Sequence, residues 1–137
     1  MAIEPFDETV IVAENDSMMR GLLRSVLNQP RRTILLATDG LGAVELATQT
    51  LATLVLLDLR MPRMDGIEAC LQIRDLRRYA TVPIVILTVF GGEALKERAR
   101  RAGVSAFLAK PFSRVELLQA INPLIAAHRI SEGLGRA

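Results

Sequence analysis

The sequence predicts an α/β fold in which a doubly wound, five-stranded parallel sheet is flanked by five helices. Short apolar runs of strand length alternate along the chain with longer segments of helical periodicity. The runs are continuously apolar, which is typical of strands covered on both faces and so of a parallel sheet between helices. The chain has 137 residues, 50% of them hydrophobic, enough for one domain with a sizeable core.

The elements follow one another in strict alternation. Strands are expected at residues 9–13, 33–37, 53–58, 83–88 and 105–110. Helices are expected at residues 17–29, 41–50, 65–79, 93–103 and 113–121. Suitable helix N-caps are Asp16 or Ser17, Asp65 and Ser113. Ser113 and Glu116 have the spacing of a capping box, and Gly103 suits the C-terminal end of the fourth helix.

Pro123 lies shortly after the last expected helix. Because proline lacks a backbone N–H, we expect either a kink or a stop near Ile121, with Asn122 as a new cap and Pro123 at the first helical position. The expected division is therefore a main domain at residues 1–121 and a C-terminal helical extension and tail at residues 122–137.

Charge and cysteine content exclude several classes of protein. Lys plus Arg number 17 against 15 Asp plus Glu, and the net charge of +2 is too small to indicate direct nucleic acid binding. Cys70 is the single cysteine, and a small buried thiol is the expected role. With no leader and no long apolar span, we expect a cytoplasmic protein that does not enter a membrane.

Polar residues concentrate where the expected strands end. In doubly wound sheets, functional groups gather outside the carboxyl ends of the strands. The second strand ends in Thr38-Asp39-Gly40, which predicts only a turn. The other four ends carry Glu14, Asn15 and Asp16, then Asp58 and Arg60, then Thr88, and finally Lys110 and Pro111.

The role expected of Asp58 depends on the polar residues at the other strand ends. Alone, an Asp after a strand commonly accepts backbone N–H bonds. Several carboxylates at one edge repel each other unless a cation lies among them, and oxygen ligands of this kind suit Mg²⁺. A carboxylate beside Mg²⁺, an ammonium group and a hydroxyl is equipped for phosphoryl transfer.

Four motifs occur in order: VIVAENDSMMR (10–20), LVLLDLRMPRMDG (54–66), VILT (85–88) and AGVSAFLAKPF (102–112). Through them the chain, from Thr9 to about Ile121, resembles a response-regulator receiver domain, which has a flavodoxin-like fold. The resemblance implies a two-component signalling domain that accepts a phosphoryl group on Asp58 from a histidine kinase or a histidine phosphotransfer protein. Such a domain then switches a protein-binding surface, and it is not an enzyme beyond slowly hydrolysing its own aspartyl phosphate.

The resemblance also assigns the other residues at the strand ends. Thr88 and Lys110 would bind phosphoryl oxygens, and Phe107 would be the aromatic residue that turns inward on activation. Pro111 would follow a cis peptide bond. The family's usual output surface is the fourth helix, the fifth strand and the fifth helix, which also allows a homodimer. On that fourth helix, charges of both signs interleave, as is typical of a solvated face.

The metal site departs from the family pattern. The Mg²⁺ ligands implied are Glu14, Asn15, Asp58 and the backbone carbonyl of Arg60, but Asn15 stands where the family usually has Asp. We therefore expect weak Mg²⁺ binding and reduced metal dependence, with Asp16 acting as a helix cap. The alternative is a pseudo-receiver, which binds proteins without being phosphorylated.

Two positions bear on the lifetime of an aspartyl phosphate. Arg60 and Phe90 lie two residues beyond Asp58 and Thr88, where the family controls access of hydrolytic water. Both are bulky, which predicts slow self-dephosphorylation. The alternative for both is an ordinary loop role.

Two rival classes fit less well. A dehalogenase-like phosphohydrolase would need a second Asp where Arg60 stands. A flavin- or nucleotide-binding module would need a Gly- or Ser/Thr-rich loop after the first strand, and the acidic residues there would repel phosphate.

Overall fold

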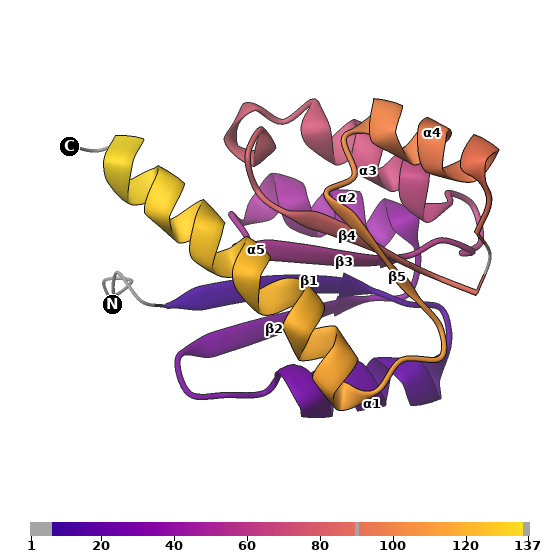
Figure 1. Cartoon of the computed structure of the whole chain (residues 1–137), viewed down its shortest axis with the longest axis horizontal. Coiled ribbons are helices and arrows are strands. Elements are labelled where there is room, and N and C mark those ends of the chain that lie inside the picture. Colours follow the sequence, from indigo (N-terminus) through magenta and orange to yellow (C-terminus); the bar gives the residue numbers. More distant parts are fainter. Residues whose placement is uncertain (1–6, 90, 136–137) are drawn as a thin grey trace.

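The computed structural model describes residues 7–89 and 91–135 and shows a five-stranded parallel sheet in the order β2-β1-β3-β4-β5 (Figure 1). The strands are β1 (Glu8–Ala13), β2 (Arg32–Ala37), β3 (Leu54–Asp58), β4 (Ile84–Thr88) and β5 (Ala106–Ala109). The helices are α1 (Ser17–Leu27), α2 (Gly40–Gln49), α3 (Gly66–Arg74), α4 (Glu93–Ala102) and α5 (Arg114–Gly135), with a 3-10 turn, η1, at Arg77–Tyr79. The predicted fold class is confirmed.

Alternate side chains along the strands point into two separate hydrophobic cores. One core lies between the sheet and α2, α3 and α4, and it receives Ile11, Val55 and Ile86. The other lies between the sheet and α1 and α5, and it receives the neighbouring residues Val10 and Leu54. Because successive side chains of a strand point to opposite faces, the continuous apolar runs are explained by helices on both faces.

The predicted helix caps are present. Asp16 Oδ2 accepts the Met19 N–H at 3.2 Å, and Asp65 Oδ1 accepts the Glu68 N–H at 2.8 Å. Ser113 Oγ accepts the Glu116 N–H at 3.0 Å, while Glu116 Oε1 accepts the Ser113 N–H at 3.1 Å. This reciprocal pair is the capping box expected before α5.

The helix expected at residues 65–79 is shorter than predicted. It ends at Arg74, and the chain turns through Leu76, which is extended, into η1. The Arg74 guanidinium stabilises this turn, because it donates hydrogen bonds to the carbonyl oxygens of Tyr79 and Val82. It also donates to the Gly103 carbonyl oxygen at 2.8 and 3.0 Å, and so joins α3 to the end of α4.

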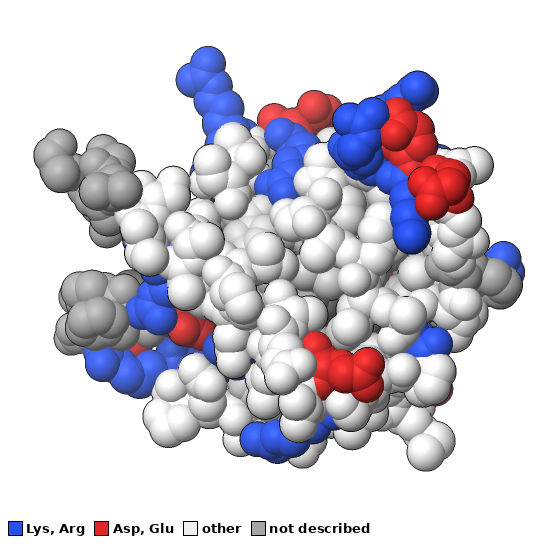
Figure 2. Space-filling model, in the orientation of Figure 1, with Lys and Arg blue, Asp and Glu red and all other residues white. Residues whose placement is uncertain are grey.

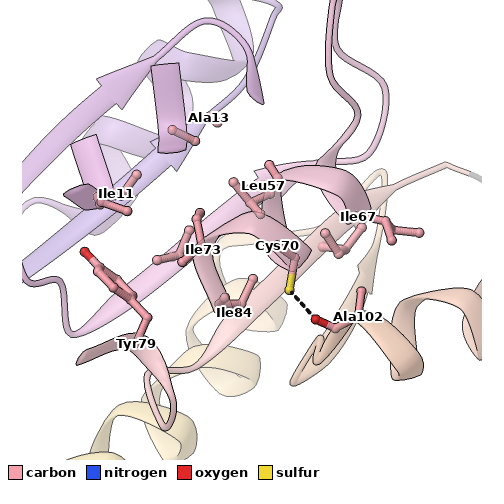
Figure 3. Close-up of a cluster of buried hydrophobic side chains, with 14 of the residues drawn as sticks. Ile11, Ala13, Leu57, Ile67, Cys70, Ile73, Tyr79, Ile84 and Ala102 are labelled. Carbon is pink, nitrogen blue, oxygen red and sulfur yellow. Dashed lines mark hydrogen bonds between the residues drawn. The ribbon is translucent and has the colours of Figure 1, made fainter. Parts of the chain in front are cut away.

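Cys70 lies on α3 and points into the core between the sheet and α2, α3 and α4 (Figure 3). Its side chain is fully buried, and the thiol donates a hydrogen bond to the Ala102 carbonyl oxygen at 3.4 Å. Burial raises the pKa of the Cys70 thiol to about 11. The expected role of Cys70 as a small buried thiol is therefore confirmed.

Of the two alternatives expected near Ile121, a kink or a stop, the stop is wrong. Helix α5 runs without a break from Arg114 to Gly135 with Pro123 inside it, and so crosses the expected domain boundary. Ile121 and Ile125 are both buried against the sheet on either side of the proline. This packing outweighs the one backbone hydrogen bond that Pro123 cannot donate.

The far end of α5 is tied to the start of the sheet. Arg129 Nη1 donates to Glu8 Oε1 at 2.9 Å, and Arg32 Nη2 lies 2.6 Å from Glu8 Oε2. Glu8 is buried, so two guanidinium groups compensate its charge. The C-terminal turns of α5 thereby belong to the same folded body.

Charges of both signs cover α4, which lies at the upper right of Figure 2. Glu97 Oε1 lies 2.6 Å from Arg100 Nη2 and 3.2 Å from Arg101 Nε. Arg98 Nη2 lies 2.9 Å from Asp65 Oδ2 and so links α4 to the cap of α3. In the part of the chain that the structure describes, no helix is both long and apolar enough to cross a bilayer.

Candidate functional site

The polar residues predicted to converge lie at the carboxyl ends of the strands, at the right-hand side of the sheet in Figure 1. Asp58 ends β3 and Thr88 ends β4, while Glu14 directly follows β1 and Lys110 directly follows β5. The parallel register pairs Asp58 with Leu87 and Thr88 with Ala109, so these residues lie at one level of the sheet.

Lys110 joins two of these strand ends. Its Nζ lies 2.5 Å from Glu14 Oε1 and 3.0 Å from Asp58 Oδ1. Glu14 and Asp58 are both buried, so the ammonium group reduces the repulsion between two carboxylates that water screens poorly. The Lys110 backbone N–H also bonds the Thr88 carbonyl oxygen at 2.8 Å, which fixes the lysine beside β4.

The surroundings of Asp58 and Lys110 shift the pKa values of both side chains. The pKa of Asp58 is raised from 3.8 to about 6, first by burial and then by the hydrogen bond and charge of Glu14, while Lys110 opposes the shift. Burial alone would lower the pKa of Lys110, but its bonds to Glu14 and Asp58 outweigh burial and raise it. Lys110 therefore stays charged at neutral pH.

The loop after β1 turns Glu14 inward and leaves Asn15 on the rim. Glu14 Oε2 accepts the Asp16 N–H at 3.2 Å, and its side chain is 1% exposed, whereas Asn15 is exposed. Asp16 caps α1, as expected, and does not replace the missing acidic ligand. Arg20 Nη1 donates to the carbonyl oxygens of Glu14 and Asn15 at 2.8 and 2.9 Å.

Close packing shapes the loop after Asp58. A Cβ on Gly66 would lie 2.4 Å from the Asp58 carbonyl oxygen, so only glycine allows α3 to begin this near to β3. The Gly66 N–H bonds the Leu59 carbonyl oxygen at 2.9 Å. Arg63, with a φ of 68°, forms an ion pair with Asp39.

Asp39 does more than the turn role predicted for Thr38-Asp39-Gly40. Its Oδ1 accepts the Gly42 N–H at 2.8 Å and caps α2. The pKa of Asp39 is lowered, first by this backbone bond and then by Arg63. No sequence pattern indicates that Arg63 reaches this carboxylate, since the pair joins separate loops.

The remaining predicted residues vary in their placement. Thr88 is buried at the end of β4. Phe107 is half-buried and packs against the core between the sheet and α2, α3 and α4. The Lys110–Pro111 peptide bond is cis, as the resemblance implies. Arg60 is exposed, and Phe90 lies outside the described residues.

The chemistry of the donor set at this edge is compatible with Mg²⁺. Within residues 7–89 and 91–135, no three His, Cys, Asp or Glu side chains cluster as metal ligands. Glu14 and Asp58 supply two carboxylates at the edge where Asn15 and the Arg60 backbone also lie. Mg²⁺ typically binds one or two carboxylates and keeps several waters, so these residues fit the ion while giving it one negative charge fewer than the family pattern.

Comparison with known proteins decides the family. Residues 10–122 match the sequence profile described as "Response regulator receiver domain". The chain belongs to the response-regulator receiver family. It is a signalling module of two-component systems rather than a classical enzyme, and histidine kinases are the partners of such domains.

Two relatives illustrate the range of similarity. The chain is 41% identical over 121 residues to the transcriptional regulatory protein PdtaR of Mycobacterium tuberculosis, covering 88% of this chain but 58% of that protein. It is 31% identical over 118 residues to the chemotaxis protein CheY of Halobacterium salinarum, covering 86% of this chain and 97% of CheY. The receiver domain thus spans little more than half of one relative and nearly all of the other.

Solved structures agree with the fold. The receiver domain of the sensor histidine kinase PA1611 from Pseudomonas aeruginosa superposes with a TM-score of 0.80 at 28% identity, covering 88% of this chain and 98% of that one. That structure holds a magnesium ion coordinated in its active-site cleft. CheY4 of Vibrio cholerae, at 24% identity, has a TM-score of 0.82 over 86% of this chain and 98% of its own, and shows the fold alone.

Proposed function

We propose that this receiver domain accepts a phosphoryl group on Asp58 from the phosphohistidine of a histidine kinase or a histidine phosphotransfer protein. The observation that carries the proposal is the contact of Lys110 Nζ with both Asp58, at 3.0 Å, and Glu14, at 2.5 Å. A lysine beside a buried strand-end carboxylate supports the proposal, because its ammonium group can neutralise charge on the oxygens of an incoming phosphoryl group.

The transfer is a substitution at phosphorus. An Asp58 carboxylate oxygen attacks the phosphorus atom in line, the bond from phosphorus to the histidine nitrogen breaks, and the imidazole leaves with that electron pair. The nucleophile must be ionised, and an Asp58 pKa of about 6 leaves it mainly ionised at pH 7.5. Lys110 and Thr88 would bind the oxygens of the transferred group, and Phe107 would turn inward when Thr88 moves toward it.

Mg²⁺ would neutralise charge on the transferring phosphoryl group. Glu14, Asn15, Asp58 and the backbone carbonyl of Arg60 would hold it. Asn15 supplies a neutral amide in place of a carboxylate, and Lys110 already compensates part of the negative charge. Both features support weak binding of the ion and a reduced dependence of phosphorylation on it.

Phosphorylation would switch the surface of α4, β5 and α5, through which a target protein or a second copy of the chain would bind. The Arg98–Asp65 ion pair supports this, because it links α4 to the loop that follows Asp58. Arg60 and Phe90 would restrict hydrolytic water and lengthen the lifetime of the aspartyl phosphate.

The test is intact-mass spectrometry after incubation with acetyl phosphate. We expect the wild type and Asp65→Asn, a control in the same loop, to gain the mass of one phosphoryl group. Asp58→Asn should gain none. Labelling of Asp58→Asn at the wild-type level would contradict the assignment.

Asn15 favours a second candidate function, a pseudo-receiver that binds its partner without phosphorylation. Asn15 is exposed at the rim and adds no charge to the site. Absence of labelling of the wild type at every Mg²⁺ concentration would favour this alternative.

A further inference from the structure

We infer that Arg20 is a positioning residue for the proposed phosphoryl site, acting through the Asn15–Asp16 peptide group on the Glu14 carboxylate. The inference rests on the proposed function and goes beyond it by adding a residue outside the four sequence-predicted strand ends. Arg20 lies in α1, one turn after the Asp16 cap, and its backbone N–H bonds the Asp16 carbonyl oxygen at 2.9 Å.

One nitrogen of Arg20 holds two successive carbonyl groups. Nη1 lies 2.8 Å from the Glu14 carbonyl oxygen and 2.9 Å from that of Asn15. Successive carbonyl groups point to opposite sides in an extended strand, so the chain must leave strand geometry for both to converge on one atom. Converging carbonyl dipoles repel each other, and hydrogen bonds from the charged guanidinium group to both oxygens offset that repulsion.

The second of these peptide groups also holds the acidic side chain. Its carbonyl oxygen, on Asn15, accepts from Arg20, while its N–H, on Asp16, donates to Glu14 Oε2 at 3.2 Å. A peptide group is planar and rigid, so a rotation that releases Arg20 also turns this N–H away from Glu14.

Glu14 is consequently held from two sides. Lys110 binds Oε1 at 2.5 Å, and the Asp16 N–H binds Oε2. Loss of the second bond would leave Lys110 alone to direct the carboxylate, which could then rotate about its terminal torsion. The orientation that Glu14 offers to Mg²⁺ would no longer be fixed.

The chain offers a matched control in Arg24. It lies one turn further along α1, is exposed, and makes no side-chain hydrogen bond or ion pair within the described part of the chain. Substitution of either arginine by glutamine removes one positive charge from the same helix, so their comparison isolates the contacts of Arg20.

The experiment compares wild type, Arg20→Gln, Arg20→Lys and Arg24→Gln by ¹H–¹⁵N NMR during titration with MgCl₂. We expect Arg20→Gln to shift the Asp16 amide resonance and to weaken Mg²⁺ binding at least threefold. Arg20→Lys should restore part of the affinity, because an ammonium group also attracts the two carbonyl oxygens. Arg24→Gln should match the wild type in both measurements.

Failure of the role inferred for Arg20 and failure of the proposed function would give different results. Equal Mg²⁺ affinity and an unchanged Asp16 amide in Arg20→Gln and Arg24→Gln would overturn the role of Arg20. If the wild type neither binds Mg²⁺ nor accepts phosphoryl, the proposed function fails, and the Asp16 amide alone decides whether Arg20 positions the loop. Should Arg20→Gln unfold, Arg20→Lys serves in the same comparison, and a wild-type affinity and Asp16 amide in that variant would overturn the requirement for the guanidinium group.

Discussion

Lys110 Nζ lies 2.5 Å from Glu14 Oε1, nearer than it lies to the Asp58 carboxylate. The glutamate side chain is one methylene longer than that of an aspartate, so its carboxylate can reach the lysine from the β1 end of the sheet. One cation thereby serves two buried acids, and the behaviour of the site depends on this sharing.

Lys110→Met should destabilise the protein at neutral pH by about 2 kcal/mol, because Glu14 and Asp58 lose their shared cation. The loss should be smaller at pH 5, where Asp58 takes up a proton. Urea unfolding at both pH values measures the effect, with Lys96→Met on the exposed face of α4 as the control. A Lys110→Met variant as stable as this control at neutral pH would contradict the sharing.

Asp58→Asn should stabilise the protein at pH 7.5. The folded pKa of Asp58, about 6, exceeds the ordinary value of 3.8, so the folded state binds the proton more tightly. The stability from this proton is fully present below pH 3.8 and is lost as pH rises through about 6. The free energy of unfolding of the wild type should therefore be lower than that of the variant by about 1–3 kcal/mol at pH 7.5, since each pKa unit corresponds to about 1.4 kcal/mol.

Urea unfolding of wild type and Asp58→Asn across pH 4.5–7.5 checks this sign. The difference should shrink steadily toward the acid end of the range. A difference that grows as the pH falls would show that the Asp58 pKa is lowered in the folded state rather than raised.

Asn15→Asp should strengthen Mg²⁺ binding by about tenfold, because it restores a third carboxylate beside Glu14 and Asp58. Isothermal titration calorimetry at fixed ionic strength measures the affinity. Ser17→Asp, which adds the same charge at an exposed position at the start of α1, is the control. Equal gains in the two variants would mean that the added charge acts only at long range.

Arg74→Met should cost about 2–4 kcal/mol of stability, because carbonyl groups of three segments lose a charged donor. Gly103, whose absent Cβ would lie 3.0 Å from Arg74 Nε, shows how closely this side chain is packed. Arg77→Met, at an exposed position in η1, should cost little. Chemical denaturation of both variants provides the comparison, and similar midpoints would exclude a structural role for Arg74.

Much of the fold could be predicted because the signals are local. Continuous apolar runs such as residues 84–87 mark buried parallel strands, and Asp16 and Ser113 mark helix starts by their spacing. The end of α3 and the course of α5 past Pro123 could not be predicted in this way. They depend on tertiary contacts, those of Arg74 with distant carbonyl groups and of Ile125 with the sheet.

The candidate site, like the fold, could be predicted only in part. Convergence of Glu14, Asp58 and Lys110 follows from the rule that strand ends share one edge, and the short contacts of Lys110 agree with it. The inward turn of Glu14 and the contacts of Arg20 depend on side-chain direction in one loop. Sequence spacing carries no information about that direction.

The central claim is that Asp58 takes the phosphoryl group, and mapping the label to a residue tests it most directly. The protein is incubated with acetyl phosphate with and without MgCl₂, digested, and the modified peptide sequenced by tandem mass spectrometry. We predict a label on Asp58 that forms without added Mg²⁺ and increases modestly with it. No label under any condition, or a label on another carboxylate while Asp58 stays unmodified, would contradict the account.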